Sequence, residues 1–252
     1  MRFLGINLCE KVPDAKTIWK FKNDLAETET VDKLFCMFDE HLENKGLISH
    51  KGTIVDATFV DAPRQRNSRD ENKKIKNGVI PEGWEKPENK SKLAQKDIDA
   101  DWTKKNGERH FGYKDHVKCD ADSKLITNYS VTSASVHDSQ RCLVFIGQED
   151  EVLYADSAYS GKPIALALPE NCKNQICEKG YRNSPLTSEQ KMNNRRKSRI
   201  RCRIEQIFGF MTGAMHGITI RSIGITRAWM NIGITNLVYN FCRYSYLKRA
   251  SA

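Results

Sequence analysis

GTIVDATFVDAP, residues 52–63, is the stretch that decides the fold. It is rich in β-branched residues and stops at a proline, which is typical of a β-strand. The alternation of a strand places Asp56 on the same face as Ile54 and Thr58. A carboxylate inside a buried strand costs several kcal/mol unless a positive charge compensates it. Asp56 is therefore a candidate functional residue.

Two other aspartates lie at the ends of expected strands. Asp61 is the alternative to Asp56, but it points to the opposite face and lies where its strand is already ending. Asp156 closes EVLYAD (151–156), another expected strand. In a mixed α/β sheet, side chains at the ends of strands line the crevice that typically holds ligands. We therefore expect Asp156, and not Asp61, to join Asp56 in a site.

The remaining segments predict a mixed α/β domain preceded by helices. Residues 1–50 have helical patterns, and a core-facing helix is expected over 226–247. Asp138 is a plausible N-cap of a short helix. Further strands are expected at 110–120, 124–135 and 174–179. This order predicts a sheet with helices on both faces.

Residues 64–109 interrupt this pattern with many lysines and almost no apolar periodicity. Such a segment predicts a long, exposed, basic insertion that is mobile unless an anion orders it. Trp84 and Trp102 within it could stack on nucleic-acid bases or pack locally, and the sequence leaves both open.

A long helix is expected from Ser188 to Gly213, because Thr187 and Gln190 have capping-box spacing. Helical periodicity places Glu205 at the edge of an apolar stripe, facing the crevice beside the sheet. The alternative is that Glu205 only pairs with Arg201, four residues earlier. The stripe comprises Ile200, Ile204, Ile207, Phe208 and Met211.

The charge of the chain indicates a polyanionic partner. The 252 residues carry a formal net charge of +9, and the basic side chains are densest just before Glu205. No apolar run approaches a membrane span, and the scattered cysteines are typical of reduced thiols in a cytoplasmic protein. The side chains expected to contact such a polyanion are Arg195, Arg196, Lys197, Arg199, Arg201 and Arg203.

Several motifs together resemble bacterial insertion-sequence transposases of the DDE type, in the group named after insertion sequence five. They are VDATFVDAP, DWTKKNGERHFGYKDHVKCD, VTSASVHDSQ, YADSAYSG and RIEQIFGF. The resemblance implies a ribonuclease-H-like core in which Asp56, Asp156 and Glu205 are the three catalytic acids. They would hold two Mg²⁺ ions, which Mn²⁺ can replace.

The resemblance also implies the reaction. Water cleaves DNA at the transposon ends, and the freed 3′-hydroxyl then attacks target DNA, with the enzyme acting as a homo-oligomer on duplex DNA. Ser198 and Thr212 stand where the family signature has tyrosine and lysine. His137, Asp138 and Tyr159 have no assigned role; Tyr159 could contact DNA or fill the turn after Asp156.

The resemblance predicts two regions: a partial helical N-terminal region (1–50) and a ribonuclease-H-like catalytic domain (51–252) with the basic insertion 64–109. In the family, a further helix precedes this region and would cover the apolar cluster of Phe3, Leu4, Ile6 and Leu8. This sequence resembles only the part after that helix, so we expect residues 1–50 to be poorly anchored. The alternative function is a truncated, inactive remnant that still binds DNA. A stand-alone ribonuclease is less favoured, because nothing singles out RNA.

Overall fold

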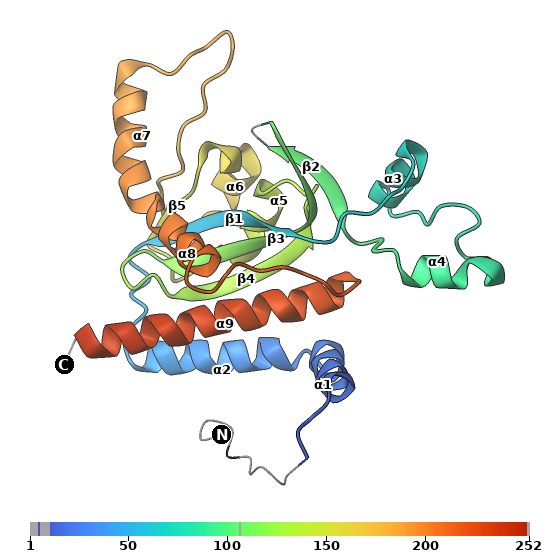
Figure 1. Ribbon diagram of the computed structural model, residues 1–252. Helices are drawn as coiled ribbons and strands as arrows, with labels where there is room; N and C mark the ends of the chain where they lie inside the picture. The colour runs from blue at the N-terminus through green and yellow to red at the C-terminus, as the bar shows by residue number, and fades with distance from the viewer. Residues whose placement is uncertain (1–4, 6–10, 106, 251–252) are drawn as a thin grey trace.

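The computed structural model describes residues 5, 11–105 and 107–250 and contains one six-stranded mixed sheet. The strand order is β2-β3-β1-β5-β6, and β4 also pairs with β3. Strand β1 is antiparallel to β3 and parallel to β5. The strands are β1 (Thr53–Asp61), β2 (Asp101–Lys105), β3 (Glu108–Asp120), β4 (Ile126–Ser133), β5 (Val152–Tyr154) and β6 (Lys173–Asn174). With helices on both faces, this confirms the expected ribonuclease-H-like α/β fold (Figure 1).

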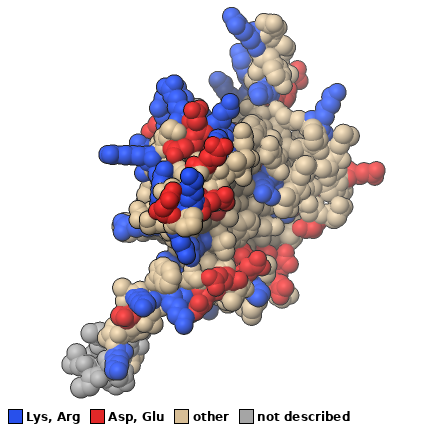
Figure 2. Space-filling model, turned by 90° about the vertical axis from the view of Figure 1, so that its right-hand side faces the viewer, with Lys and Arg blue, Asp and Glu red and all other residues tan. Residues whose placement is uncertain are grey.

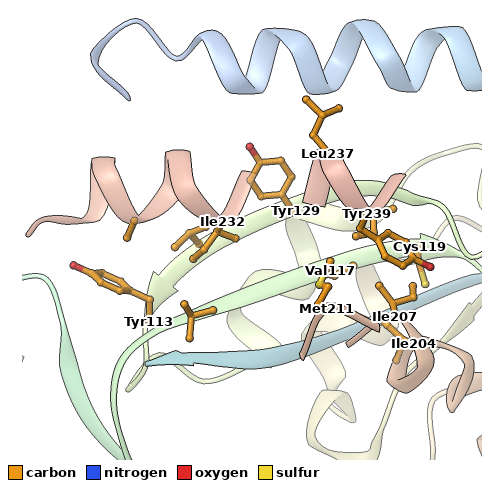
Figure 3. Close-up of a cluster of buried hydrophobic side chains, with 14 of the residues drawn as sticks. Tyr113, Val117, Cys119, Tyr129, Ile204, Ile207, Met211, Ile232, Leu237 and Tyr239 are labelled. Carbon is orange, nitrogen blue, oxygen red and sulfur yellow. The ribbon is translucent and has the colours of Figure 1, made fainter. Parts of the chain in front are cut away.

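Helices α8 (Arg203–Thr212) and α9 (Ile225–Ala250) cover one face of the sheet, and α5 (Ser139–Phe145) and α6 (Lys162–Ala167) contribute to the core on the other. The main core lies between the sheet, α8 and α9 (Figure 3). Ile232 and Tyr239 of α9 point toward the sheet, whereas Leu237 points away from it toward α2. α9 is therefore buried on two sides, against the sheet and against α2.

Helices α1 (Ala15–Glu27) and α2 (Thr30–Asn44) form an outer layer on α9. Trp229 of α9 donates a hydrogen bond from Nε1 to Asp32 of α2 (2.9 Å), and Arg227 Nε donates to Asn23 of α1 (2.8 Å). The expectation of poor anchoring is therefore wrong for residues 11–50. The cluster of Phe3, Leu4, Ile6 and Leu8 lies outside the described residues. Among the described helices, none has the length and apolarity needed to cross a membrane.

The insertion has more regular structure than its composition predicts. It contains α3 (Arg69–Lys76), a 3₁₀ turn (Pro87–Asn89) and α4 (Lys90–Ala94), and its last part forms β2. Trp84 is 2% exposed and donates from Nε1 to Glu71 (3.0 Å). The local-packing alternative for Trp84 is therefore confirmed, since a buried indole organises the insertion from inside.

The long helix predicted from Ser188 is broken at Cys202 into α7 (Ser188–Arg201) and α8. The capping box of Thr187 and Gln190 is present, as expected. α7 buries none of its residues, whereas α8 buries Ile204, Ile207 and Met211. Figure 1 shows α7 extending away from the sheet and α8 lying on it. The apolar half and the basic half of the segment are thus separate helices.

A buried acid–amide pair joins the sheet to α9. Asp115 of β3 is fully buried and accepts a hydrogen bond from Asn236 Nδ2 (3.2 Å). Among the described residues, Asp115 Oδ2 and Asn236 Oδ1 have no partner. Burial raises the pKa of Asp115 to about 8. A protonated Asp115 could donate back to the amide oxygen, which would pair both groups.

This pair predicts a pH-dependent contribution to stability. The folded pKa lies above the unfolded value, so this contribution falls as pH rises from about 4 toward 8. Asp115→Asn keeps a neutral pair, so the variant should gain stability over wild type by at least about 1 kcal/mol between pH 5 and pH 8. Urea unfolding at both pH values measures the difference. An equal difference at the two pH values would show that Asp115 is not protonated in the folded chain.

Candidate active site

Asp56 lies on the face of β1 that α8 and α9 cover. It is paired across the sheet with Val117, and its neighbour on that face, Ile54, is paired with Cys119. The side chain is 14% exposed, and its Oδ1 accepts from the Ala57 backbone N–H (2.8 Å). Burial raises the pKa of Asp56 to about 6; the Ala57 hydrogen bond opposes this, and the nearby Asp156 charge adds to it. Asp56 is thus a carboxylate whose ionised form needs positive charge.

Arg201 supplies that charge and bridges two of the acids. Its Nη1 lies 3.1 Å from Asp56 Oδ2, and its Nη2 lies 2.7 Å from Glu205 Oε1. Burial alone would lower the pKa of Arg201, but the charges of Asp56, Glu205 and Asp156 raise it above its usual value. The pairing of Arg201 with Glu205, which was the alternative from the sequence, is present, and Arg201 also connects Glu205 to Asp56. Arg201 was expected only to contact DNA, so its contact with Asp56 was not predicted.

Asp156 follows β5 and starts a short 3₁₀ turn (Ser157–Tyr159). Its Oδ1 accepts from the Ala158 backbone N–H (2.7 Å), which fixes the direction of the side chain. Its charge affects the pKa values of both Asp56 and Arg201, so it belongs to the same cluster. Tyr159 is fully buried against the other face of the sheet, so it fills the core after Asp156.

These acids suit a divalent cation by the chemistry of their donor atoms. Three carboxylates come from three separate elements, and Glu205 remains 57% exposed, so an ion could reach its oxygen atoms from solvent. Hard cations such as Mg²⁺ prefer such oxygen ligands. In this structure the Arg201 guanidinium already neutralises two of the three groups. A bound cation would therefore have to share these carboxylates with Arg201 or displace it.

A second cluster meets the distance criterion for a metal site within the described part of the chain. His50, Glu149 and Asp150 have ligand atoms within 4.8 Å of one another. Asp150, however, already accepts from Thr53 Oγ1 (2.6 Å) and pairs with Lys118 Nζ (2.9 Å). The Lys118 ammonium thus occupies the place where a metal ion would bind. The cluster contains none of Asp56, Asp156 and Glu205.

The basic side chains expected to contact DNA divide into two groups. Arg195, Arg196 and Arg199 are exposed on α7. Lys197 donates to the Ile176 carbonyl (2.9 Å), and Arg203 pairs with Asp122 (3.0 Å). The first three are therefore free to meet an anion, whereas Lys197, Arg201 and Arg203 are held by protein groups.

Asp138 does not cap helix α5, so the N-cap prediction is wrong. Its side chain makes no cap hydrogen bond and instead pairs with Lys114 Nζ of β3 at 2.7 Å. Lys105 Nζ of β2 lies 4.0 Å from the same carboxylate and also lowers the pKa of Asp56. Lys105 therefore adds positive charge beside the acids, and no sequence motif indicated it.

Comparison with known proteins gives one family. A family model described as a transposase DDE domain matches residues 48–241, more than half of the chain. The matched range includes Asp56, Asp156 and Glu205 together with the insertion. No solved structure matches the chain.

Proposed function

Because this chain belongs to the family of DDE-type transposases, we propose that it cleaves DNA at the ends of an insertion sequence and joins the freed ends to target DNA. The observation that carries the proposal is that Arg201 pairs with both Asp56 and Glu205, while the charge of Asp156 acts on the pKa values of Asp56 and Arg201. Three acids from a strand interior, a strand end and a helix thus act on one guanidinium, as acids of one site would. We assign these three as the catalytic, metal-binding acids.

Transposases of this family use divalent cations, and the three acids are the residues that would hold two Mg²⁺ ions here. Such ions activate the attacking oxygen and stabilise the leaving oxygen. The chain itself orients the carboxylates: the Ala57 and Ala158 amides fix one oxygen each of Asp56 and Asp156. Arg201 and Lys105 offset the repulsion between the acids.

We further propose the insertion-sequence-five group and action as a homo-oligomer on duplex DNA in the bacterial cytoplasm. Residues 51–252 would form the catalytic domain with its insertion 64–109, and residues 1–50 the partial helical region. The sequence motifs support the group assignment, and the packing of α1 and α2 outside the layer of α9 supports the division.

Cleavage of a supercoiled plasmid that carries the inverted repeats flanking the gene tests the function. Purified protein with Mg²⁺ or Mn²⁺ should nick the repeat ends and produce joined products. The alternative, a truncated remnant, predicts DNA binding without cleavage at any cation concentration. A preference of about a thousandfold for the repeats over random duplex is the range of specific DNA-binding proteins and would argue against the remnant.

The exposed arginines of α7 predict a salt-dependent affinity for arbitrary duplex DNA. Each phosphate contact adds roughly 0.9 to the slope of log affinity against log salt. Changing Arg195, Arg196 and Arg199 together to glutamine should therefore flatten the slope by about two to three units. Fluorescence anisotropy over a range of salt concentrations measures it.

Lys45, Lys51 and Lys248, changed together to glutamine, form the charge-matched control, because they are exposed and lie outside α7. The control should change the slope by less than one unit. Equal slopes for the α7 variant and wild type would mean that this basic face is only solvated surface.

A further inference from the structure

A hollow of about 570 Å³ lies between the insertion and the loop that joins α8 to α9. We call it the insertion hollow; its walls are residues 63–65 after β1, residues around α4, and residues 221–223 of the loop. Hydrogen bonds fix this loop, because Ile220 N donates to the Asp61 carbonyl (3.2 Å) and Ile225 N donates to Asp99 Oδ2 (2.9 Å). The hollow is distinct from the candidate active site, since none of the three acids lines it.

The lining of the insertion hollow is strongly positive. It includes Arg64, Lys92, Lys96 and Arg221. Asp97 is the acid among the described lining residues, and it is 3% exposed. Its carboxylate oxygens accept from the Tyr113 hydroxyl (2.8 and 2.7 Å). The acid is thus withdrawn into the wall, whereas Arg64, Lys92 and Arg221 are exposed.

Protein groups hold several of these cations in place. Lys96 Nζ donates to the Arg66 carbonyl (2.9 Å) and to Asn67 Oδ1 (2.7 Å). The Arg64 guanidinium lies 5.8 Å from the centre of the Trp102 ring. Lys92 Nζ lies 4.9 Å from the centre of the Trp84 ring and 3.5 Å from Glu71 Oε1, so Glu71 partly neutralises it. Side chains ordered in advance lose less entropy when they bind an anion.

A smaller hollow of about 330 Å³ continues the positive strip toward α1. It shares Arg221 and Ser222 with the insertion hollow and is also lined by Lys22, Arg227 and Trp19. Trp19 is 59% exposed, so its ring is available for stacking. Figure 2 looks onto the side of the molecule that carries the insertion, where lysine and arginine side chains lie among acidic ones.

We propose that the insertion hollow binds the phosphate backbone of duplex DNA, as a contact separate from both the three acids and α7. The proposal rests on the proposed function for the identity of the polyanion. Duplex DNA fits better than a small anion, because the cations extend over two adjoining hollows and three segments of the chain.

The position of the hollow gives the spacing of the contact. β1 runs from Asp56 to Asp61, and Pro63 of the hollow follows directly. An extended chain from Asp56 to Pro63 spans about 23 Å, which is the upper limit of their separation. At about 3.4 Å per base pair, a duplex that reaches both places would have the phosphate in the hollow within about seven base pairs of the acids.

Changing Arg64, Lys96 and Arg221 together to glutamine tests the proposal in the full chain. The salt slope of affinity for random duplex should flatten by about two to three units. Phosphate-ethylation interference should lose a signal within about seven base pairs of the cleavage position. Arg221→Gln alone should flatten the salt slope by about one unit. Because Arg221 is exposed, this single variant should fold even if the triple variant does not.

Lys73, Lys76 and Lys86, changed together to glutamine, are the matched control, because they are exposed on the same insertion outside the hollow. The control should change the slope by less than one unit. An unchanged slope in both the triple and the Arg221 variants, with a flattened slope in the α7 variant, would overturn the proposal. Flattened slopes without cleavage by wild type would support the contact and contradict the proposed function.

Discussion

Asp56→Asn, Asp156→Asn and Glu205→Gln should each reduce cation-dependent DNA cleavage at least about a thousandfold and leave DNA affinity within about twofold. Each change keeps the shape of the side chain and removes the negative charge that a divalent cation requires. Removing one group that stabilises charge in a transition state typically slows catalysis by about a hundred- to a thousandfold. Plasmid nicking measures cleavage, and anisotropy measures binding.

The three variants should remain folded. In Asp156→Asn the side-chain amide oxygen can still accept the Ala158 amide hydrogen, and Glu205 is more than half exposed. Asp61→Asn is the control: Asp61 is 70% exposed, on the opposite face of β1. Full cleavage by any one of the three variants would remove that residue from the site.

Arg201→Gln should increase the affinity of the DNA-free protein for Mn²⁺ about ten- to hundredfold. In wild type, a cation must replace charge-assisted hydrogen bonds from Arg201 to Asp56 and Glu205, and such bonds are worth about 1.5–3 kcal/mol. Titration followed by electron paramagnetic resonance measures free Mn²⁺ directly, without reference to cleavage.

Arg199→Gln is the matched control for Arg201, because it removes the same charge from the same helix at an exposed position. Its Mn²⁺ affinity should stay within about twofold of wild type. Weaker Mn²⁺ binding in Arg201→Gln would instead show that Arg201 holds the acids in the geometry that the cation needs. Thermal unfolding of both variants checks that the site is still formed.

Local patterns predicted that Asp56 lies inside a strand and Glu205 on a helix. The alternation of β1 placed Asp56 on the face toward α8, and the apolar stripe of α8 placed Glu205 at its edge. Both predictions depend on the periodicity of a single element. The same reasoning missed the break at Cys202, because the apolar and basic positions continue in helical register across it.

Features that depend on distant partners could not be predicted in this way. Asp138 looked like a helix cap because its partner Lys114 lies on a strand 24 residues earlier. The insertion looked irregular because Trp84 and Ile75 organise it with very few apolar residues. Arg201 was assigned to DNA by composition, whereas its contact with Asp56 joins residues 145 positions apart.

The break at Cys202 has a consequence for how the site responds to its ligands. Arg201 is the last residue of α7, a helix without buried residues, whereas Glu205 belongs to the buried α8. A DNA phosphate that drew α7 toward it would therefore move Arg201 relative to Asp56. Thermodynamic linkage then requires reciprocity: the factor by which DNA strengthens cation binding equals the factor by which the cation strengthens DNA binding. The break at Cys202 would then leave Arg201 paired with the acids when no ligand is bound. DNA and the cation would each increase the affinity of the chain for the other.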